Sequence, residues 1–134
     1  MDYESFKFTE DEKKNLIINR DKIISWIMSD IIPYILPDDL ISIDFGKDYY
    51  SPRSEEYVKS YHLDVCGGKS IESSHNGQHV LMAEKFGNFI PLSEVDDYTT
   101  IYALIDNWKS IKNQLLASIR TRSEVHNKIE NFEV

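Results

Sequence analysis

Apolar residues near the start of the chain recur every three or four positions, the spacing of one face of an α-helix. This stripe consists of Leu16, Ile17, Ile24, Ile27, Met28 and Ile31, with Trp26 at its flank. Thr9 and Glu12 have the spacing of a capping box, and the first turn is acidic, as the helix dipole favours. We therefore expect a helix over residues 10–32, which Pro33 and Pro37 end.

The middle of the chain instead alternates between apolar and polar residues, the period of a half-buried strand. We expect four strands, at residues 40–45, 57–65, 79–86 and 89–92. In the first, Ile41, Ile43 and Phe45 share one face. The second has one face of Tyr57, Tyr61, Leu63 and Val65 and another of Val58, Ser60, His62 and Asp64. Gly87-Asn88 is a hairpin signal between the last two strands.

A second helical stripe fills the last third of the chain, behind Asp96 or Asp97 as its cap. It consists of Ile101, Leu104, Ile105, Trp108, Ile111, Leu115 and Ile119, and then thins to Val125, Ile129 and Phe132. A helix reaching residue 131 would span about 35 residues and roughly 50 Å, more than the diameter of a domain of this size. We therefore expect residues 120–134 to be a projecting or oligomerising helix end.

Together these elements predict an α+β fold, in which an antiparallel meander of about four strands lies between an N-terminal helix and a long C-terminal helix. The natural architecture is a two-layer sandwich with both helices on the apolar face of the sheet. The length of 134 residues fits one domain, residues 1–134, with a single core.

Composition limits the expected cellular location of the protein and the kinds of partner that it can bind. One cysteine excludes an internal disulfide framework, and the polar, acidic start predicts no signal peptide, so we expect a cytoplasmic protein. No apolar run approaches the length of a membrane span. Residues 1–100 carry 19 acidic and 10 basic side chains, whereas residues 101–134 carry 4 and 5. An acidic body repels phosphate, which disfavours direct nucleic-acid binding.

Residues 62–79, HLDVCGGKSIESSHNGQH, look the most like a reactive site. Gly-Gly-Lys-Ser resembles the end of a phosphate loop, but position 63 is leucine where that loop needs glycine, and no helix-forming sequence follows. His62 and Cys66 are about 13 Å apart along a strand, and Asn76-Gly77 predicts a turn between His75 and His79. We therefore expect neither a metal site nor a cofactor.

An acid–base pair is the remaining catalytic hypothesis. His62 and Asp64 share the polar face of their strand, and Asp44 on the neighbouring strand would lie beside them. A histidine next to carboxylates can act as a general base. This constellation supports the alternative function, a hydrolase or nucleotide-binding enzyme working on the open sheet face, whereas a solvated polar face explains the same residues without catalysis.

Candidate contact residues favour a binding protein instead. Tyr49 and Tyr50, close to Arg53, are expected in a loop, and aromatic and arginine side chains are common at interface centres. Arg120 and Arg122 on the C-terminal helix suit an acidic partner or a second copy of the chain. We therefore expect a protein partner and a homodimer through the C-terminal helix.

Residues 87–112, which include GNFIPLSEVDDY and NWKSIK, resemble short phage or prophage proteins of low-GC bacteria. No functional residue carries over from this resemblance. The leading hypothesis is a small acidic cytoplasmic protein that acts by binding another macromolecule, as a non-catalytic inhibitor of the immunity or phage anti-defence type. An acidic surface that imitates nucleic acid is a minority alternative.

Overall fold

The computed structural model describes residues 3, 6–36, 38–45, 49–51, 56–58, 61–67, 81–85 and 88–134. Its helices are α1 (Glu10–Asp30), α3 (Tyr98–Asp106) and α4 (Trp108–Glu130), with short 3₁₀ turns η2 (Ile32–Tyr34) and η4 (Leu92–Glu94). Its strands are β1 (Leu40–Phe45), β2 (Tyr49–Ser51), β3 (Glu56–Val58), β4 (Tyr61–Cys66), β5 (Leu81–Lys85) and β6 (Asn88–Pro91). The predicted α+β class is confirmed.

The capping box at the start of α1 is also confirmed. The Glu12 N–H donates to Thr9 Oγ1 at 3.2 Å, and the Thr9 N–H donates to Glu12 Oε1 at 2.8 Å. Each bond satisfies a backbone donor that a helix start would otherwise leave open. The helix then buries Leu16, Ile23 and Ile27, and it ends at Asp30, before the turn that contains Pro33.

Strands β1, β4, β5 and β6 form an antiparallel sheet in that order. Along β4, Tyr61, Leu63 and Val65 are buried, whereas the residues between them are half-buried. Ile43 and Phe45 of β1 are buried on the same side. Alternation in the sequence therefore predicts correctly which face of these strands joins the core.

The predicted strand 57–65 is wrong as a single element. Residues 56–58 form β3, which pairs with β2 in a separate two-stranded sheet, so that Tyr57 lies opposite Tyr50. Tyr49 and Tyr50 are therefore in a strand and not in a loop. Tyr57 and Tyr61 fit one period of two although Lys59 lies between them, and alternation by itself does not reveal that the chain changes sheets.

Asn88 is likewise a strand residue, because it pairs with Lys85 across β5 and β6. It is therefore not part of the two-residue turn that Gly87-Asn88 predicts. Gly87 lies outside the described residues. The two strands on either side pair antiparallel, as β5 and β6.

The predicted C-terminal helix is interrupted at Asn107, between α3 and α4. Asp97 caps α3, because its carboxylate accepts from the Thr99 N–H at 3.1 Å. The Asn107 backbone has φ −102° and ψ 7°, and its side-chain amide donates to the Ala103 carbonyl at 2.7 Å. An asparagine amide competes with the backbone in this way, which explains why the helix breaks here.

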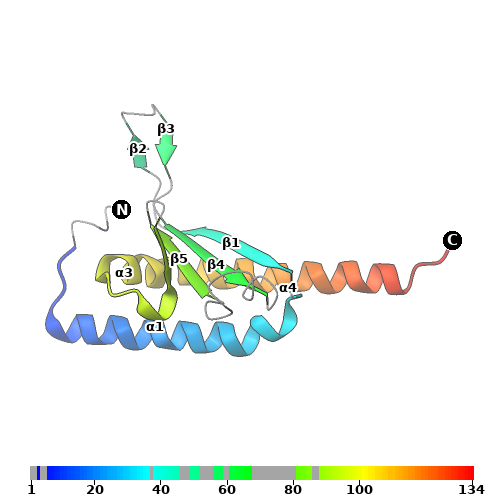
Figure 1. Cartoon of the computed structure of the whole chain (residues 1–134), viewed down its shortest axis with the longest axis horizontal. Coiled ribbons are helices and arrows are strands. Elements are labelled where there is room, and N and C mark those ends of the chain that lie inside the picture. The colour runs from blue at the N-terminus through cyan, green and yellow to red at the C-terminus, as the bar shows by residue number, and fades with distance from the viewer. Residues whose placement is uncertain are drawn as a thin grey trace.

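Figure 1 shows α1 running alongside α3 and α4, with the four-stranded sheet on the other side of α4. Trp26 of α1 meets Trp108 of α4 edge-to-face, with ring centroids 5.4 Å apart, and α4 packs against β1. The end of α4 extends beyond the rest of the molecule (Figure 1). Among the described helices, none combines the length and apolar character that crossing a membrane requires.

Candidate functional site

The outer face of the sheet brings together the predicted acid–base residues. Asp44 lies directly opposite His62 across β1 and β4, and His62 Nδ1 is 2.9 Å from Asp44 Oδ1. The side chain of His62 is 35 % exposed and that of Asp44 is 41 % exposed. An imidazole held by a carboxylate has a fixed orientation, so this pair has the geometry to accept or donate a proton at the surface.

Asp64 points to the same face but has a different partner. It lies opposite Ser42, whose hydroxyl donates to Asp64 Oδ1 at 2.6 Å. The serine hydroxyl is thus bonded to a carboxylate, whereas a nucleophilic serine needs a base such as histidine. The structure therefore gathers His62, Asp64 and Asp44 on one face but divides them into two separate pairs.

Glu84 is a further acidic residue at this site that the sequence analysis did not single out. In the backbone register it lies opposite His62 on β5, so His62 stands between an aspartate position and a glutamate position. The signal was present, because Glu84 has a polar position in the alternating pattern of the predicted strand 79–86. The register that brings it to His62 comes only from the paired strands.

Cys66 ends the row of outward positions on β4. Burial raises the pKa of its thiol, and the negative charge of Asp64 raises it further. A raised pKa keeps the sulfur protonated at neutral pH, and a protonated thiol is a poor nucleophile. Cys66 is therefore not placed to act as a catalytic nucleophile.

The metal and phosphate-loop interpretations concern residues that are mostly not described. Residues 68–80, with His75, His79 and the Lys-Ser of Gly-Gly-Lys-Ser, lie outside the described part of the chain. Gly67 is described, and its N–H donates to the Asp39 carbonyl at 2.7 Å, which ties the end of β4 to the start of β1. Within the described ranges, no three histidine, cysteine or acidic side chains gather around a possible metal position.

The predicted contact residues that the structure describes belong to other elements than the histidine–carboxylate pair. Tyr49 and Tyr50 belong to β2, whereas Arg53 falls outside the described residues. Arg120 is exposed on α4. Arg122 Nη2 lies 3.2 Å from Asp39 Oδ1, so this arginine joins α4 to the segment before β1.

Asp39 is anchored at two points. Its Oδ2 accepts from the Leu36 N–H at 2.8 Å, and this bond is the main reason why the pKa of Asp39 is lowered, with Arg122 adding to the effect. Next to this pair, a groove between β1 and α4 is lined by Ile35, Asp39, Leu40, Ile41, Ala117, Ser118, Thr121, Arg122 and Val125. The groove is largely apolar, with one ion pair at its side.

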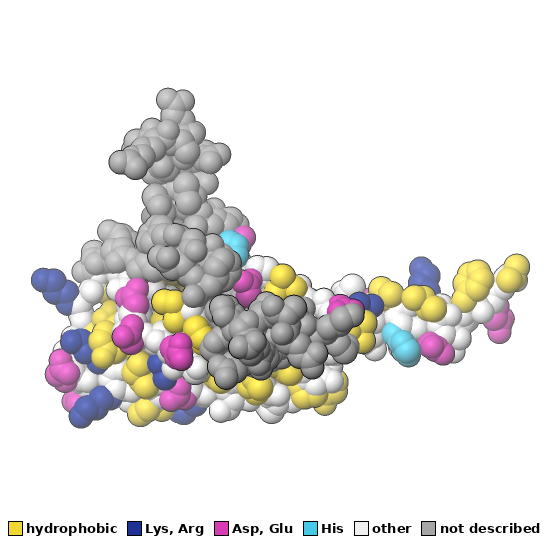
Figure 2. Space-filling model, in the orientation of Figure 1, with side chains coloured by type: hydrophobic (Ala, Val, Ile, Leu, Met, Phe, Trp, Pro, Cys, Tyr) yellow, Lys and Arg dark blue, Asp and Glu magenta, His cyan; other side chains and the backbone are white. Residues whose placement is uncertain are grey.

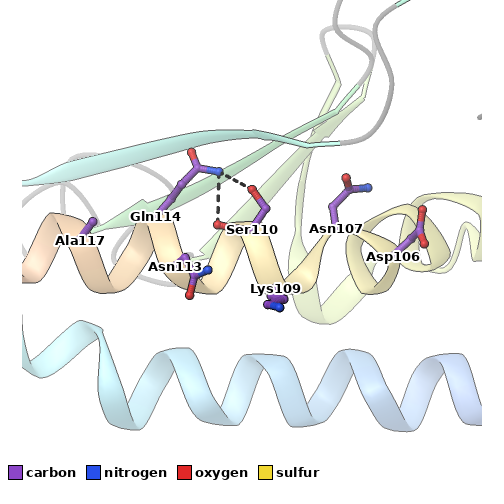
Figure 3. Close-up of a pocket in the computed structure, with 7 residues that line it drawn as sticks. All are labelled: Asp106, Asn107, Lys109, Ser110, Asn113, Gln114 and Ala117. Atoms are coloured by element: carbon purple, nitrogen blue, oxygen red, sulfur yellow. Dashed lines mark hydrogen bonds between the residues drawn. The ribbon is translucent and has the colours of Figure 1, made fainter.

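A second hollow lies along α3 and α4, where seven described residues line it (Figure 3). They are Asp106, Asn107, Lys109, Ser110, Asn113, Gln114 and Ala117. The Gln114 amide donates to the carbonyl and to the hydroxyl of Ser110, at 3.4 and 3.2 Å. All seven come from one continuous stretch of the chain across the break between α3 and α4, so this hollow is not a site where distant elements converge.

Among the described residues, the geometry therefore contains a partly exposed histidine–carboxylate pair on the sheet, a groove of mixed apolar and charged residues between β1 and α4, and a hollow along α3 and α4. Comparison with protein families, with curated proteins and with solved structures finds no match to this chain.

Proposed function

We propose that this protein acts in the cytoplasm by binding another protein, as a non-catalytic inhibitor of the immunity or phage anti-defence type. The observation that carries this proposal is the β2–β3 hairpin, which pairs as its own two-stranded sheet and stands clear of the four-stranded sheet (Figure 1). An isolated two-stranded hairpin is at best marginally stable in water, so a bound partner would stabilise it. Its two strands contain Tyr49, Tyr50 and Tyr57, with Tyr50 opposite Tyr57 in the register, and aromatic residues are common in protein interfaces.

The architecture that we propose behind this function is a two-layer sandwich, in which the helices cover one face of a four-stranded meander. The burial alternation along β4 supports it, because Tyr61, Leu63 and Val65 join a core that also contains Ile27 of α1 and Ile111 of α4. In this arrangement the other face of the sheet stays open, and the hairpin is an insertion between two neighbouring strands, β1 and β4. Insertions of this kind can vary without disturbing the core.

Charge supports a protein partner over nucleic acid. The formal net charge is −8, and residues 1–100 alone carry a balance of −9, which repels a phosphate backbone. A partner with a basic surface would instead be attracted and oriented by this field. Imitation of nucleic acid by the acidic surface stays a less favoured form of the same proposal, because lysines are interspersed among the acids.

Affinity capture from the native host tests the hairpin directly. We expect the full-length chain to retain a specific protein and the variant Tyr49→Ser/Tyr50→Ser to lose it, because two aromatic contacts are removed from the hairpin. Tyr34→Ser is the matched control, since Tyr34 is 61 % exposed in η2, away from the hairpin. Equal capture by all three chains would contradict the assignment of the hairpin as the contact.

The second candidate function is a hydrolase or nucleotide-binding enzyme, and the 2.9 Å contact between His62 and Asp44 is the observation that favours it. Against it stands the exposure of the pair on an open sheet face, because catalytic groups usually work in sites that exclude water. If the chain is an enzyme, His62→Ala/Asp64→Ala will abolish its function and leave the circular dichroism spectrum unchanged. Full function in this double variant would remove the enzyme hypothesis.

A further inference from the structure

The apolar stripe by which α4 joins the core continues along the projecting end of the helix. Ile111 and Leu115 are fully buried, and Val125, Ile129 and Phe132 follow them at spacings that keep them on nearly the same face. These three side chains are 43, 71 and 73 % exposed. Figure 2 shows apolar side chains along this end of the molecule. The helix face that is buried within the domain is thus exposed on the projecting end of α4.

This exposed end gains little stability from the rest of the protein. Every residue from Ser123 to Val134 is exposed, so the helix here buries no side chain in the core. Isolated helices shorter than about 12–15 residues are marginal in water, and most helical stability in proteins comes from packing an apolar face. Contact with another molecule along Val125, Ile129 and Phe132 would supply that packing.

The charges on the same segment indicate what that molecule is. From residue 120 to residue 133 their signs run plus, plus, minus, plus, minus, minus, in the order Arg120, Arg122, Glu124, Lys128, Glu130 and Glu133. Read in the reverse direction, every sign is the opposite. The segment is therefore complementary to an antiparallel copy of itself, whereas a parallel copy would bring each charge next to its like.

We propose that two copies of this chain associate through the projecting ends of α4, antiparallel and around a twofold axis near His126. At a rise of about 1.5 Å per residue, this arrangement brings opposite charges to the same level within about one residue. Arg120 is then level with Glu133, Arg122 with Glu130, and Glu124 with Lys128 of the second copy, so the positive start of one segment lies alongside the negative end of the other. The same patch serves both copies, as an isologous twofold interface requires.

The groove between β1 and α4 extends the proposed interface from the projecting helix end to the rest of the protein. In the antiparallel arrangement, Phe132 of the second copy lies at the level of Arg120 and Thr121, where the groove begins. Val125 lines both this groove and the apolar hollow formed with Lys128, Ile129 and Phe132. The apolar surface is therefore continuous from the groove to the tip, and a second copy covers both parts at once.

Sedimentation equilibrium of the full-length chain, from low to high micromolar concentration, tests the proposal. We expect the mass to rise from 15.7 kDa toward twice that value with concentration, and the association to weaken with salt. Ile129→Ser should weaken the dimer by about tenfold or more, because it removes one of the three exposed apolar side chains of the proposed interface. Asn127→Ser, on the opposite face of the same turn, is the matched control and should leave the dimer unchanged.

A charge exchange tests the attraction between the two segments and leaves the Arg122–Asp39 ion pair intact. Arg120→Glu/Lys128→Glu should weaken the dimer, because both segments become mainly acidic and repel each other, and Glu124→Lys/Glu133→Arg should do the same by making both mainly basic. Mixed in equal amounts, the two variants should form a heterodimer, since one segment is then mainly acidic and the other mainly basic. Circular dichroism of each variant confirms that loss of the dimer is not loss of the fold.

The outcomes are separable from those of the proposed function. A wild-type chain that stays monomeric at high micromolar concentration overturns the second copy as the occupant, as does a mixture of variants that stays monomeric. Capture of a foreign protein through the hairpin would be untouched by either result. Conversely, a capture experiment that contradicts the hairpin as the contact would not affect the proposed α4 dimer.

Discussion

Asp39 shows how much a single side chain can connect. Its carboxylate accepts from the Leu36 N–H and pairs with Arg122 of α4, 83 residues away in the sequence. Both contacts favour the charged form, and the backbone bond contributes most to the lowered pKa. The residue thereby links the turn before β1 to the start of the projecting helix end.

Because the pKa of Asp39 is lower in the folded chain, its contribution is fully present above the ordinary value near 3.8 and is lost as the pH falls through the folded value. Asp39→Asn keeps an acceptor for Leu36 but removes the charge. We expect it to lower the free energy of unfolding by up to about 1 kcal/mol at pH 7, with the difference shrinking below about pH 4.

Urea unfolding of both chains across this pH range measures the effect. Asp96→Asn, at an exposed aspartate before α3, controls for the change in net charge. A difference between wild type and Asp39→Asn that stays constant from neutral to strongly acidic pH would show that the carboxylate does not stabilise the fold through its charge.

At the residue scale, the sequence predicts the sheet face on which a side chain lies better than it predicts the residues that the side chain contacts. Alternation alone places Asp44, His62 and Asp64 on one side of the sheet, and the structure puts them there. It does not predict that the Ser42 hydroxyl bonds to Asp64 or that Glu84 lies opposite His62 in the backbone register, because these depend on which strands pair and in which register. The contact between Asp39 and Arg122 joins residues 83 positions apart, so the sequence pattern does not predict it either.

Among the elements, the break between α3 and α4 depends on a residue from the other end of the chain. Tyr3 Oη donates to Asp106 Oδ2 at 2.7 Å and accepts from the Asn107 amide at 3.0 Å. Its ring is 6 % exposed and packs edge-on against Tyr61 and Tyr102. Burial and the bond to Asp106 raise the pKa of the Tyr3 hydroxyl, which keeps it protonated as a donor.

Tyr3→Phe removes the hydroxyl and keeps the ring, so it isolates these two hydrogen bonds. We expect a loss of about 1 kcal/mol in the free energy of unfolding, because Asp106 is exposed and regains water while Asn107 keeps its bond to Ala103. Chemical denaturation measures this loss, with Tyr34→Phe at an exposed site as the control. Equal stability of Tyr3→Phe and wild type would rule out the anchoring role of the hydroxyl.

The two elements that the sequence predicts wrongly have the same physical origin. Residues 97–131 are helix-compatible throughout, and the interruption at Asn107 is stabilised by Tyr3, 104 residues away. Tyr57, Tyr61, Leu63 and Val65 fit one period of two, and the change from β3 to β4 depends on which strand each segment pairs with. Local patterns fix the type of structure, whereas long-range contacts decide where an element is divided.

For the whole molecule, the length of the C-terminal stripe is the most informative feature of the sequence. A helix of about 50 Å exceeds the body of a small domain, and α4 does extend beyond the rest of the chain (Figure 1). The separate hairpin, in contrast, has no counterpart in the sequence pattern. These two projections, β2–β3 and the end of α4, are the surfaces through which we propose that the protein works.

Amide hydrogen exchange of residues 120–130 at low and at high protein concentration tests this account most directly. If the end of α4 is an interface between copies, its amides exchange rapidly in the dilute monomer and become protected as the concentration rises, while amides around the buried Ile111 stay protected throughout. Identical exchange of residues 120–130 at both concentrations would contradict an interface at this helix end.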